Sequence, residues 1–268
     1  KTFTRLPMPY GLSDAIDAKL HEIEEPNVNA GWVAMSPDTH NIVWSIADCI
    51  ELPSKLVVGS HDGGQTYFKV KIDGADDNNG KIKVFADRVN NSVFYGFGES
   101  GQFYVSTDAG ESFNIAAAGL PRIDFGSIDT ADKTEIRVEG GQTGVIYIAT
   151  GDAGLYKLIY NLENGGVTLM RLSADGDSVF RIGLGLGRPR GDYLKEKKAV
   201  YLCGVIDGQY GFYRSFDDCN TYERINTDRQ MFGDINSIDG DKRVFGRFFI
   251  ATGSRGVIYG EACVEGEN

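Results

Sequence analysis

The sequence of 268 residues has little of what most metal, hydrolase and nucleic-acid sites are built from. It contains three histidines (His21, His40 and His61), scattered without the spacing of a metal site. No Gly-x-Ser-x-Gly segment accompanies them, so nothing indicates a Ser-His-Asp hydrolase. The 27 lysines and arginines are outnumbered by 38 aspartates and glutamates. The net charge of −11 argues against a nucleic-acid-binding surface, which needs a basic patch.

Long apolar segments and paired cysteines are also missing. No apolar run reaches the roughly 18 residues that a membrane helix requires, so no membrane partner is expected. Four cysteines, Cys49, Cys203, Cys219 and Cys263, form no Cys-x-x-Cys pair and no zinc pattern. Their even number permits two disulfide bonds, and Cys203 and Cys219 are able to meet on neighbouring strands. Buried free thiols agree with the sequence equally well.

What the sequence does contain is typical of an all-β protein. Glycine is abundant, with 35 residues, and aromatic residues make up 11%. Alternation appears over residues 81–85 and 145–149, which predicts β-strands there. Helical periodicity is confined to one short candidate over residues 12–23. The predicted fold class is therefore all-β.

A short motif of the form Ser-x-Asp-x-Gly-x-(Thr/Ser)-aromatic, the Asp-box, recurs along the chain. Complete copies occupy residues 60–67 and 106–113, and a third copy at 215–222 has Cys219 in place of the glycine. Residues 1–3 (Lys-Thr-Phe) match the last three positions of one more copy. We therefore expect that the chain begins inside a motif and is a fragment of a longer protein.

The residue types of this motif suit a tight turn between strands. The aspartate accepts hydrogen bonds from nearby backbone N–H groups, and the glycine permits a positive φ. Thr or Ser then restarts a strand, and the aromatic residue packs inward. Because none of these groups is a nucleophile or metal ligand by design, the motif is predicted to be structural. The predicted structural residues are Ser60, Asp62, Gly64, Thr66, Ser106, Asp108, Gly110, Ser112, Ser215, Asp217 and Thr221.

The spacing of the copies predicts how many units the chain contains. The Thr/Ser position recurs at 2, 66, 112 and 221, and the last interval is about twice the others. A degenerate copy is therefore expected between them, with Thr168 in the repeat position. Units of roughly 45–65 residues with short strands are typical of four-stranded β-propeller blades. The predicted units cover residues 1–67, 68–113, 114–169 and 170–222, followed by closing strands over 223–268.

Further segments resemble one enzyme family, both in their amino-acid sequence and in their order along the chain. Together they resemble the C-terminal end of glycoside hydrolase family 74, the xyloglucan-degrading endoglucanases and reducing-end-specific cellobiohydrolases. The resemblance covers the chain almost from end to end, which makes it more specific than an Asp-box alone. The matching segments are residues 86–90, 94–95, 103–106, 119–121, 183–191, 199–204, 208–226, 240–241 and 244–260.

The resemblance implies a fold, an activity and partners. Family members are secreted, and they hold the glucan between two seven-bladed propellers. This chain would supply about four blades of the second propeller, and another polypeptide segment would supply the remaining blades and the N-terminal propeller. Two aspartates, one in each propeller, hydrolyse the β-1,4-glucan backbone with inversion, as acid and base. The family's general acid follows a Leu-Gly-Asp-like stretch that does not occur here; Phe232-Gly233-Asp234 is similar but lies in the terminal blade.

We therefore expect no catalytic residue in this chain and no activity from the chain alone. Substrate contacts remain possible, because sugar-binding surfaces need exposed aromatic rings. Trp32 follows a glycine, and Tyr95 and Phe97 lie near a glycine-rich turn, so these three are the candidate substrate-binding residues. The second tryptophan, Trp44, lies in an apolar strand and is expected in the core.

Two functional interpretations follow. In the first, the chain forms one wall of the substrate cleft of a family 74-like xyloglucanase, with xyloglucan or a related β-glucan as partner. In the alternative, it belongs to a non-catalytic Asp-box propeller that acts as a binding or scaffold module. Fold alone does not separate them, but the ordered motifs favour the first. Neither requires a metal ion or another cofactor.

Overall fold

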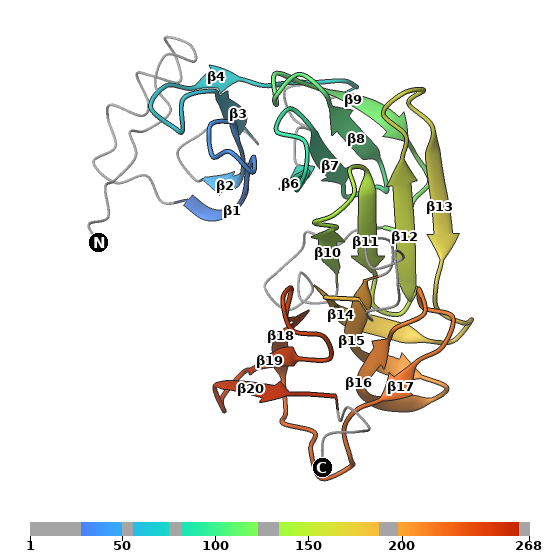
Figure 1. Cartoon of the computed structure of the whole chain (residues 1–268). Coiled ribbons are helices and arrows are strands. Elements are labelled where there is room, and N and C mark those ends of the chain that lie inside the picture. The colour runs from blue at the N-terminus through green and yellow to red at the C-terminus, as the bar shows by residue number, and fades with distance from the viewer. Residues whose placement is uncertain (1–27, 50–55, 75–81, 123–133, 188–197, 263–268) are drawn as a thin grey trace. The chain divides into compact units, whose positions relative to one another are not determined.

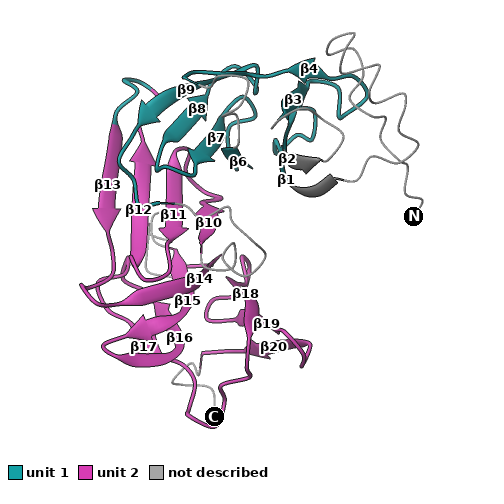
Figure 2. Ribbon diagram, turned by 180° about the vertical axis from the view of Figure 1, so that it is seen from behind, with its two compact units in different colours: residues 1–123, 163–166 teal, residues 124–162, 167–268 magenta. Residues whose placement is uncertain are grey.

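The computed structural model describes residues 28–49, 56–74, 82–122, 134–187 and 198–262, and within these ranges every regular element is a β-strand (Figure 1). This confirms the predicted all-β class. No helix in the described ranges could cross a membrane. The residues group into two compact units, one of residues 1–123 with 163–166 and one of residues 124–162 with 167–268 (Figure 2). The motif fragment predicted at residues 1–3 and the helical candidate at 12–23 lie outside the described residues.

The first unit contains two sheets, in which short loops join consecutive antiparallel strands. The strand that follows each Asp-box is the fourth of its sheet, and β5 extends the second sheet by parallel pairing with β9. One sheet comprises β1 (Val28–Met35), β2 (Ile42–Cys49), β3 (Leu56–Ser60) and β4 (Phe68–Lys69). The other comprises, in spatial order, β5 (Lys71–Ile72), β9 (Ser112–Ala117), β8 (Phe103–Ser106), β7 (Phe94–Gly98) and β6 (Ile82–Ala86).

The second unit contains three sheets, all of them antiparallel meanders. Four-stranded meanders of this kind are the blades of β-propellers. The first sheet comprises β10 (Glu135–Val138), β11 (Val145–Ala149), β12 (Leu155–Tyr160) and β13 (Val167–Arg171). The second comprises β14 (Ser178–Gly185), β15 (Ala199–Ile206), β16 (Gln209–Ser215) and β17 (Glu223–Arg224). The third comprises β18 (Ile235–Gly240), β19 (Phe248–Thr252) and β20 (Val257–Gly260).

The sheets extend further along the chain than the predicted repeat units. The predicted limits at residues 67, 113, 169 and 222 fall before or within the fourth strand of a sheet. An Asp-box is the turn of a hairpin, so the strand after it pairs with the strand before it and belongs to the same sheet. The hairpin β12–β13 occupies the place of the degenerate copy, and Thr168 pairs with Ile159 there.

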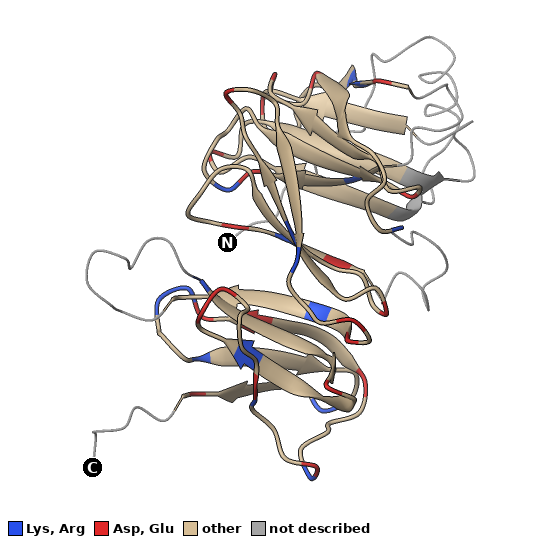
Figure 3. Ribbon diagram, turned by 90° about the vertical axis from the view of Figure 1, so that its right-hand side faces the viewer, with Lys and Arg blue, Asp and Glu red and all other residues tan. Residues whose placement is uncertain are grey.

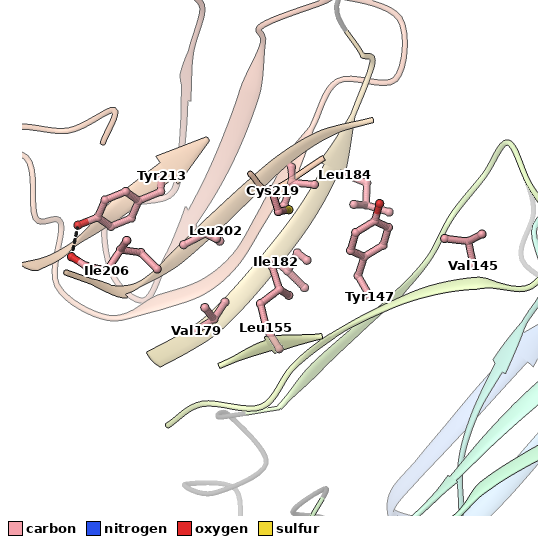
Figure 4. Packing of buried hydrophobic residues seen from close by; sticks show 12 residues of the cluster. Val145, Tyr147, Leu155, Val179, Ile182, Leu184, Leu202, Ile206, Tyr213 and Cys219 are labelled. Carbon is pink, nitrogen blue, oxygen red and sulfur yellow. Dashed lines mark hydrogen bonds between the residues drawn. The ribbon is translucent and has the colours of Figure 1, made fainter. Parts of the chain in front are cut away.

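Packing between neighbouring sheets forms the core of the second unit. Val145, Tyr147 and Leu155 of the β10–β13 sheet face apolar side chains of the β14–β17 sheet (Figure 4). Burial of this kind contributes about 25 cal/mol per Å² of apolar surface. The first strands of the sheets lie against one another, β10 against β14 and β14 against β18. The same arrangement occurs in the first unit, where β1 lies against β6.

Cys203 and Cys219 are not joined to each other. Cys203 and Cys219 are both buried free thiols, so the disulfide bond that the sequence allowed between them is not formed. They belong to different core clusters: Cys203 packs toward the β18–β20 sheet and Cys219 toward the β10–β13 sheet. The Cys203 sulfur lies 3.2 Å from the Tyr210 hydroxyl instead. Cys263 lies outside the described residues.

Candidate functional site

The first Asp-box is a closed hydrogen-bonded turn between β3 and β4. The Asp62 carboxylate accepts hydrogen bonds from the Thr66 backbone N–H at 2.9 Å and the Thr66 hydroxyl at 2.6 Å. It also accepts from the Gln65 N–H and from the Ser60 hydroxyl, at 2.9 and 2.8 Å. The Ser60 oxygen in turn accepts the N–H of Gly64 at 2.8 Å. The side chains of Ser60, Asp62 and Thr66 are therefore all used within the turn.

The second and third boxes repeat this arrangement. In the second, Asp108 accepts from the Ser106 hydroxyl at 2.7 Å and from the backbone N–H and hydroxyl of Ser112 at 3.0 and 2.5 Å. In the third, Asp217 accepts from Ser215 at 2.8 Å and from the N–H and hydroxyl of Thr221 at 3.0 and 2.6 Å. The same hydrogen-bonded frame is therefore built in three different sheets.

The glycine of the motif also serves packing between sheets. Gly110 has φ +92°, and a Cβ at that position would lie 2.4 Å from Val43 Cγ2 of the preceding sheet. Only a residue without a side chain fits there without displacing Val43. In the third box, Cys219 adopts the corresponding left-handed conformation at φ +64°, preceded by Asp218, also at φ +64°. That box therefore places a buried thiol where the other boxes have glycine.

Hydrogen bonding lowers the pKa of the box aspartates. Donation by the Thr66 side chain and backbone lowers the pKa of Asp62 well below its usual value. For Asp108 and Asp217, burial acts to raise the pKa, but the hydrogen bonds from Ser112 and Thr221 outweigh it and the net pKa is lowered. Such carboxylates are ionised at neutral pH and accept hydrogen bonds only. They suit turn closure, not proton donation.

Two of the three candidate sugar-binding residues are wrongly predicted. Tyr95 and Phe97 lie on β7 and are completely buried, so neither ring presents a face to a ligand. Both pack against Phe103, with ring centroids 5.9 and 5.1 Å away, and the Tyr95 hydroxyl donates to Asp87 at 2.6 Å. Gly96, between them on β7, leaves room for side chains of neighbouring strands, because a Cβ there would lie 3.3 Å from both Phe113 and Tyr104.

Trp32 lies in a different environment from these two residues. It is half-buried on β1, where it packs beside the apolar cluster of the first unit. The Lys83 ammonium lies 5.9 Å from the centre of its ring, within the range of a cation–π contact. Trp44 on β2 is also half-buried rather than fully enclosed. Trp32 is therefore the remaining candidate sugar contact among the three.

A buried carboxyl group that the sequence did not reveal lies at the end of β10. The Glu139 side chain is 4% exposed, and Lys198 Nζ lies 3.9 Å away. Burial raises the pKa of Glu139, and the charges of Lys198 and Lys157 oppose that rise without cancelling it. The sequence gives no signal for this group, because Lys198 lies far along the chain. A carboxyl enclosed this completely offers no face to a sugar.

Charged residues of both signs occur throughout the part of the chain that the structure describes (Figure 3). Lysines and arginines are interspersed with aspartates and glutamates along the described chain (Figure 3). Several are paired at the surface, as in the bidentate contact of Arg214 with Glu223 at 2.9 Å. Among the described residues, no group of three or more His, Cys, Asp or Glu side chains could hold a metal ion.

Comparisons with known proteins locate this fold among carbohydrate-active enzymes. No protein-family model matches the chain. It is 34% identical over 236 residues to a xyloglucanase of Paenibacillus sp., covering 86% of this chain and 20% of that protein. It is 36% identical over 242 residues to xyloglucanase Xgh74A of Acetivibrio thermocellus, covering 89% of this chain and 25% of that protein.

A solved structure that is similar to this chain is also that of a xyloglucanase. The crystal structure of the family 74 xyloglucanase from Xanthomonas campestris superimposes with a TM-score of 0.68 at 30% identity, covering 87% of this chain and 30% of that one. The chain thus spans between a fifth and a third of the length of the proteins it matches. Over most of its length, the chain is a relative of one portion of the xyloglucanases of glycoside hydrolase family 74.

Proposed function

We propose that this chain is part of a secreted glycoside hydrolase that cleaves the β-1,4-glucan backbone of xyloglucan with inversion. In this proposal it forms part of the second propeller and one wall of the substrate cleft. The observation that carries the proposal is the 34–36% identity to xyloglucanases over 86–89% of the chain. The Asp-box hairpins support it, because they recur in three sheets.

In this proposal, the residues of this chain support the wall of the cleft and bind the glucan, and they transfer no proton. Inversion needs one protonated and one ionised carboxyl on opposite sides of the sugar. The box aspartates are held ionised by their turns, and Glu139 is enclosed in the protein. We therefore assign both catalytic aspartates to polypeptide outside this chain. The blades described here would hold their own part of the cleft wall rigid.

Trp32 is the residue that we propose contacts the glucan. An indole ring that keeps some exposure can stack on the C–H face of a glucose unit. Replacing it by Ala should weaken xyloglucan binding, and a loss of about tenfold corresponds to roughly 1.4 kcal/mol. Trp44→Phe provides a control in the neighbouring strand and should retain the affinity. Equal affinities for the Trp32→Ala variant and the unmodified protein would remove Trp32 from the site.

The decisive experiment is an assay of native material that contains this chain. Protein purified from its source without denaturation should release oligosaccharides from xyloglucan, identified by mass spectrometry, with the inverted anomer detected first by proton NMR. The isolated 268-residue chain should release none. Native material that contains the chain but neither binds nor cleaves xyloglucan would exclude the hydrolase and favour a non-catalytic propeller module.

A further inference from the structure

The fourth strand of the β10–β13 sheet differs from the other fourth strands. β13 pairs with β12 over 5 residues, whereas β4 and β17 contain 2 residues each. β9 is also longer, but β5 covers its outer edge by parallel pairing. Figure 1 shows β13 as the last strand of its sheet. Within the described ranges, β13 is therefore the long fourth strand whose outer edge pairs with no other strand.

The outer edge of β13 presents unpaired backbone groups. The Leu172 N–H donates to the Leu155 carbonyl at 2.8 Å, which continues the register of β12 with β13. In an antiparallel pair, every second residue bonds to the neighbouring strand in this way. The residues between them direct their N–H and C=O groups outward, and these are Val167, Leu169 and Arg171. No group in the described part of the chain pairs with them, so the edge is a template for a further strand.

This edge has none of the features that usually prevent strand pairing. Natural edge strands are very short, or they carry lysine, proline or a bulge. β13 reads Val-Thr-Leu-Met-Arg, and its register with β12 is regular throughout. Leu169 is 38% exposed on one face of the strand and Met170 is 37% exposed on the other. The charged residue of the strand, Arg171, is already paired with Asp175.

From these observations we propose that β13 pairs with β13 of a second copy of this chain, antiparallel about a two-fold axis at Leu169. In this register Leu169 lies opposite its counterpart in the second copy, and Val167 lies opposite Arg171. Each of these pairs exchanges two N–H···O=C hydrogen bonds, so all the outward groups are satisfied. On the other face, Thr168 meets Met170. The proposal goes beyond the proposed function, because it assigns a partner and not a reaction.

The distribution of charge favours this arrangement of two copies. A net charge of −11 opposes association through most of the surface of the chain. Residues 167–170 carry no charge, so two copies can approach along this edge. In the antiparallel pair each Arg171 lies beside an uncharged Val167. Parallel pairing in register would instead place the two arginines side by side, which is unfavourable.

Two other occupants fit the edge less well. A glucan needs an exposed aromatic ring, and β13 contains no aromatic residue. An extended segment of an unrelated protein can use the same backbone groups, but the side chains of this edge provide no charge to select it, since Arg171 is paired. A second copy supplies a strand of equal length, with apolar residues opposite apolar residues. It is the occupant that satisfies every outward group of the edge.

Sedimentation velocity over a concentration series tests the proposal on the native protein that contains this chain. The solution mass should double as the concentration rises. Leu169→Pro removes an outward N–H that β12 does not use, so the fold should be retained. The dissociation constant of the dimer should rise by about tenfold or more, because hydrogen bonds across the axis are lost. Near-ultraviolet circular dichroism of each variant verifies that the sheets still pack.

A charge swap tests the position of the two-fold axis. Leu169→Lys and Leu169→Glu should each be monomeric, because like charges would face one another across the axis. An equimolar mixture of these two variants should regain the doubled mass. Leu162→Lys is the matched control, since Leu162 is 39% exposed but lies in the turn before β13. It should dimerise like the unmodified protein.

Amide hydrogen exchange gives a readout that needs no variant. In the unmodified protein, exchange at the outward N–H of Leu169 should slow as the dimer forms. Exchange at Thr168, whose N–H already bonds to β12, should change little. An equal change at both positions would show general stabilisation of the hairpin and would overturn strand pairing.

Each further outcome also decides. Loss of the dimer in both charge variants, with recovery in their mixture, supports the proposal. A protein that keeps one mass at all concentrations overturns it. A dimer that persists in both variants overturns it in favour of another surface, and a different polypeptide bound at β13 overturns it in favour of an unrelated partner. Hydrolysis is not part of these readouts, so failure of this proposal leaves the proposed function standing.

Discussion

The ammonium of Lys157 on β12 lies 3.0 Å from the carboxylate of Asp218 in the third Asp-box. The same ammonium lies 5.4 Å from the centre of the Tyr147 ring. The two charged residues belong to consecutive sheets of the second unit, so the contact ties the middle of one sheet to the turn of the next. Asp218 reaches it from a left-handed backbone conformation.

A double-mutant cycle should detect this contact. Lys157→Met and Asp218→Asn should each lower the free energy of unfolding, and their coupling should be about 0.5–1 kcal/mol, measured by urea unfolding. Asn is chosen because it tolerates a positive φ. The exposed pair Lys242–Asp239 is the control and should give a coupling near zero. If the coupling energy of Lys157 and Asp218 is no larger than that of the control pair, the contact does not stabilise the packing of the two sheets.

Substitution of the box glycine should disturb the contact between sheets. Gly110→Ala should destabilise the protein by about 2 kcal/mol or more, because the new Cβ meets Val43 and the φ of +92° is strained for alanine. Gly119→Ala is matched for positive φ, but nothing lies within 4 Å of its Cβ, so it should cost less. Thermal unfolding compares the two variants, and equal costs would show that backbone strain alone decides.

Acid should destabilise the fold through the box aspartates. Their pKa values are lowered in the folded protein, so each contributes stability that is present above its ordinary value near 3.8 and lost as pH falls through the folded pKa. Asp108→Asn should lower stability at pH 7 and flatten its decline below pH 4, measured by urea unfolding across that range. Asp175→Asn, at an exposed surface position, is the comparison variant. An unchanged pH profile for Asp108→Asn would refute the assignment.

Glu139 should make the stability depend on pH in the opposite direction from the box aspartates. Its folded pKa lies above the ordinary value near 4.5, so the folded state retains the proton longer and stability falls as pH rises from that value through the folded pKa. Glu139→Gln should remove this fall, and stability at pH 7 should be equal to or above that of the unmodified protein. Glu111→Gln, at an exposed position of the second Asp-box, is the comparison variant. A marked loss of stability at pH 7 in Glu139→Gln would show that pairing with Lys198 outweighs burial.

The local parts of this structure could be predicted from the sequence. The hydrogen bonds of an Asp-box each span five residues, as from Ser60 to Gly64 and from Asp62 to Thr66, so the short motif contains all the groups that these bonds join. Alternating polarity likewise identified strands such as β6 and β11. The family resemblance could be seen for the same reason, because it rests on ordered short segments. The predicted limits of the sheets were less accurate, because a motif does not show with which strand the following segment pairs.

The tertiary structure decided which faces are covered. Tyr95 and Phe249 both lie on middle strands of sheets with alternating side chains, yet Tyr95 is completely buried and Phe249 is exposed. Alternation defines two faces of a strand, but it does not show which face another part of the protein covers. The same holds for Glu139, whose pKa depends on burial and on Lys198 brought to it by folding. The sequence alone therefore determined the turns, the strands and the kinship, and packing between sheets determined which residues are available to bind.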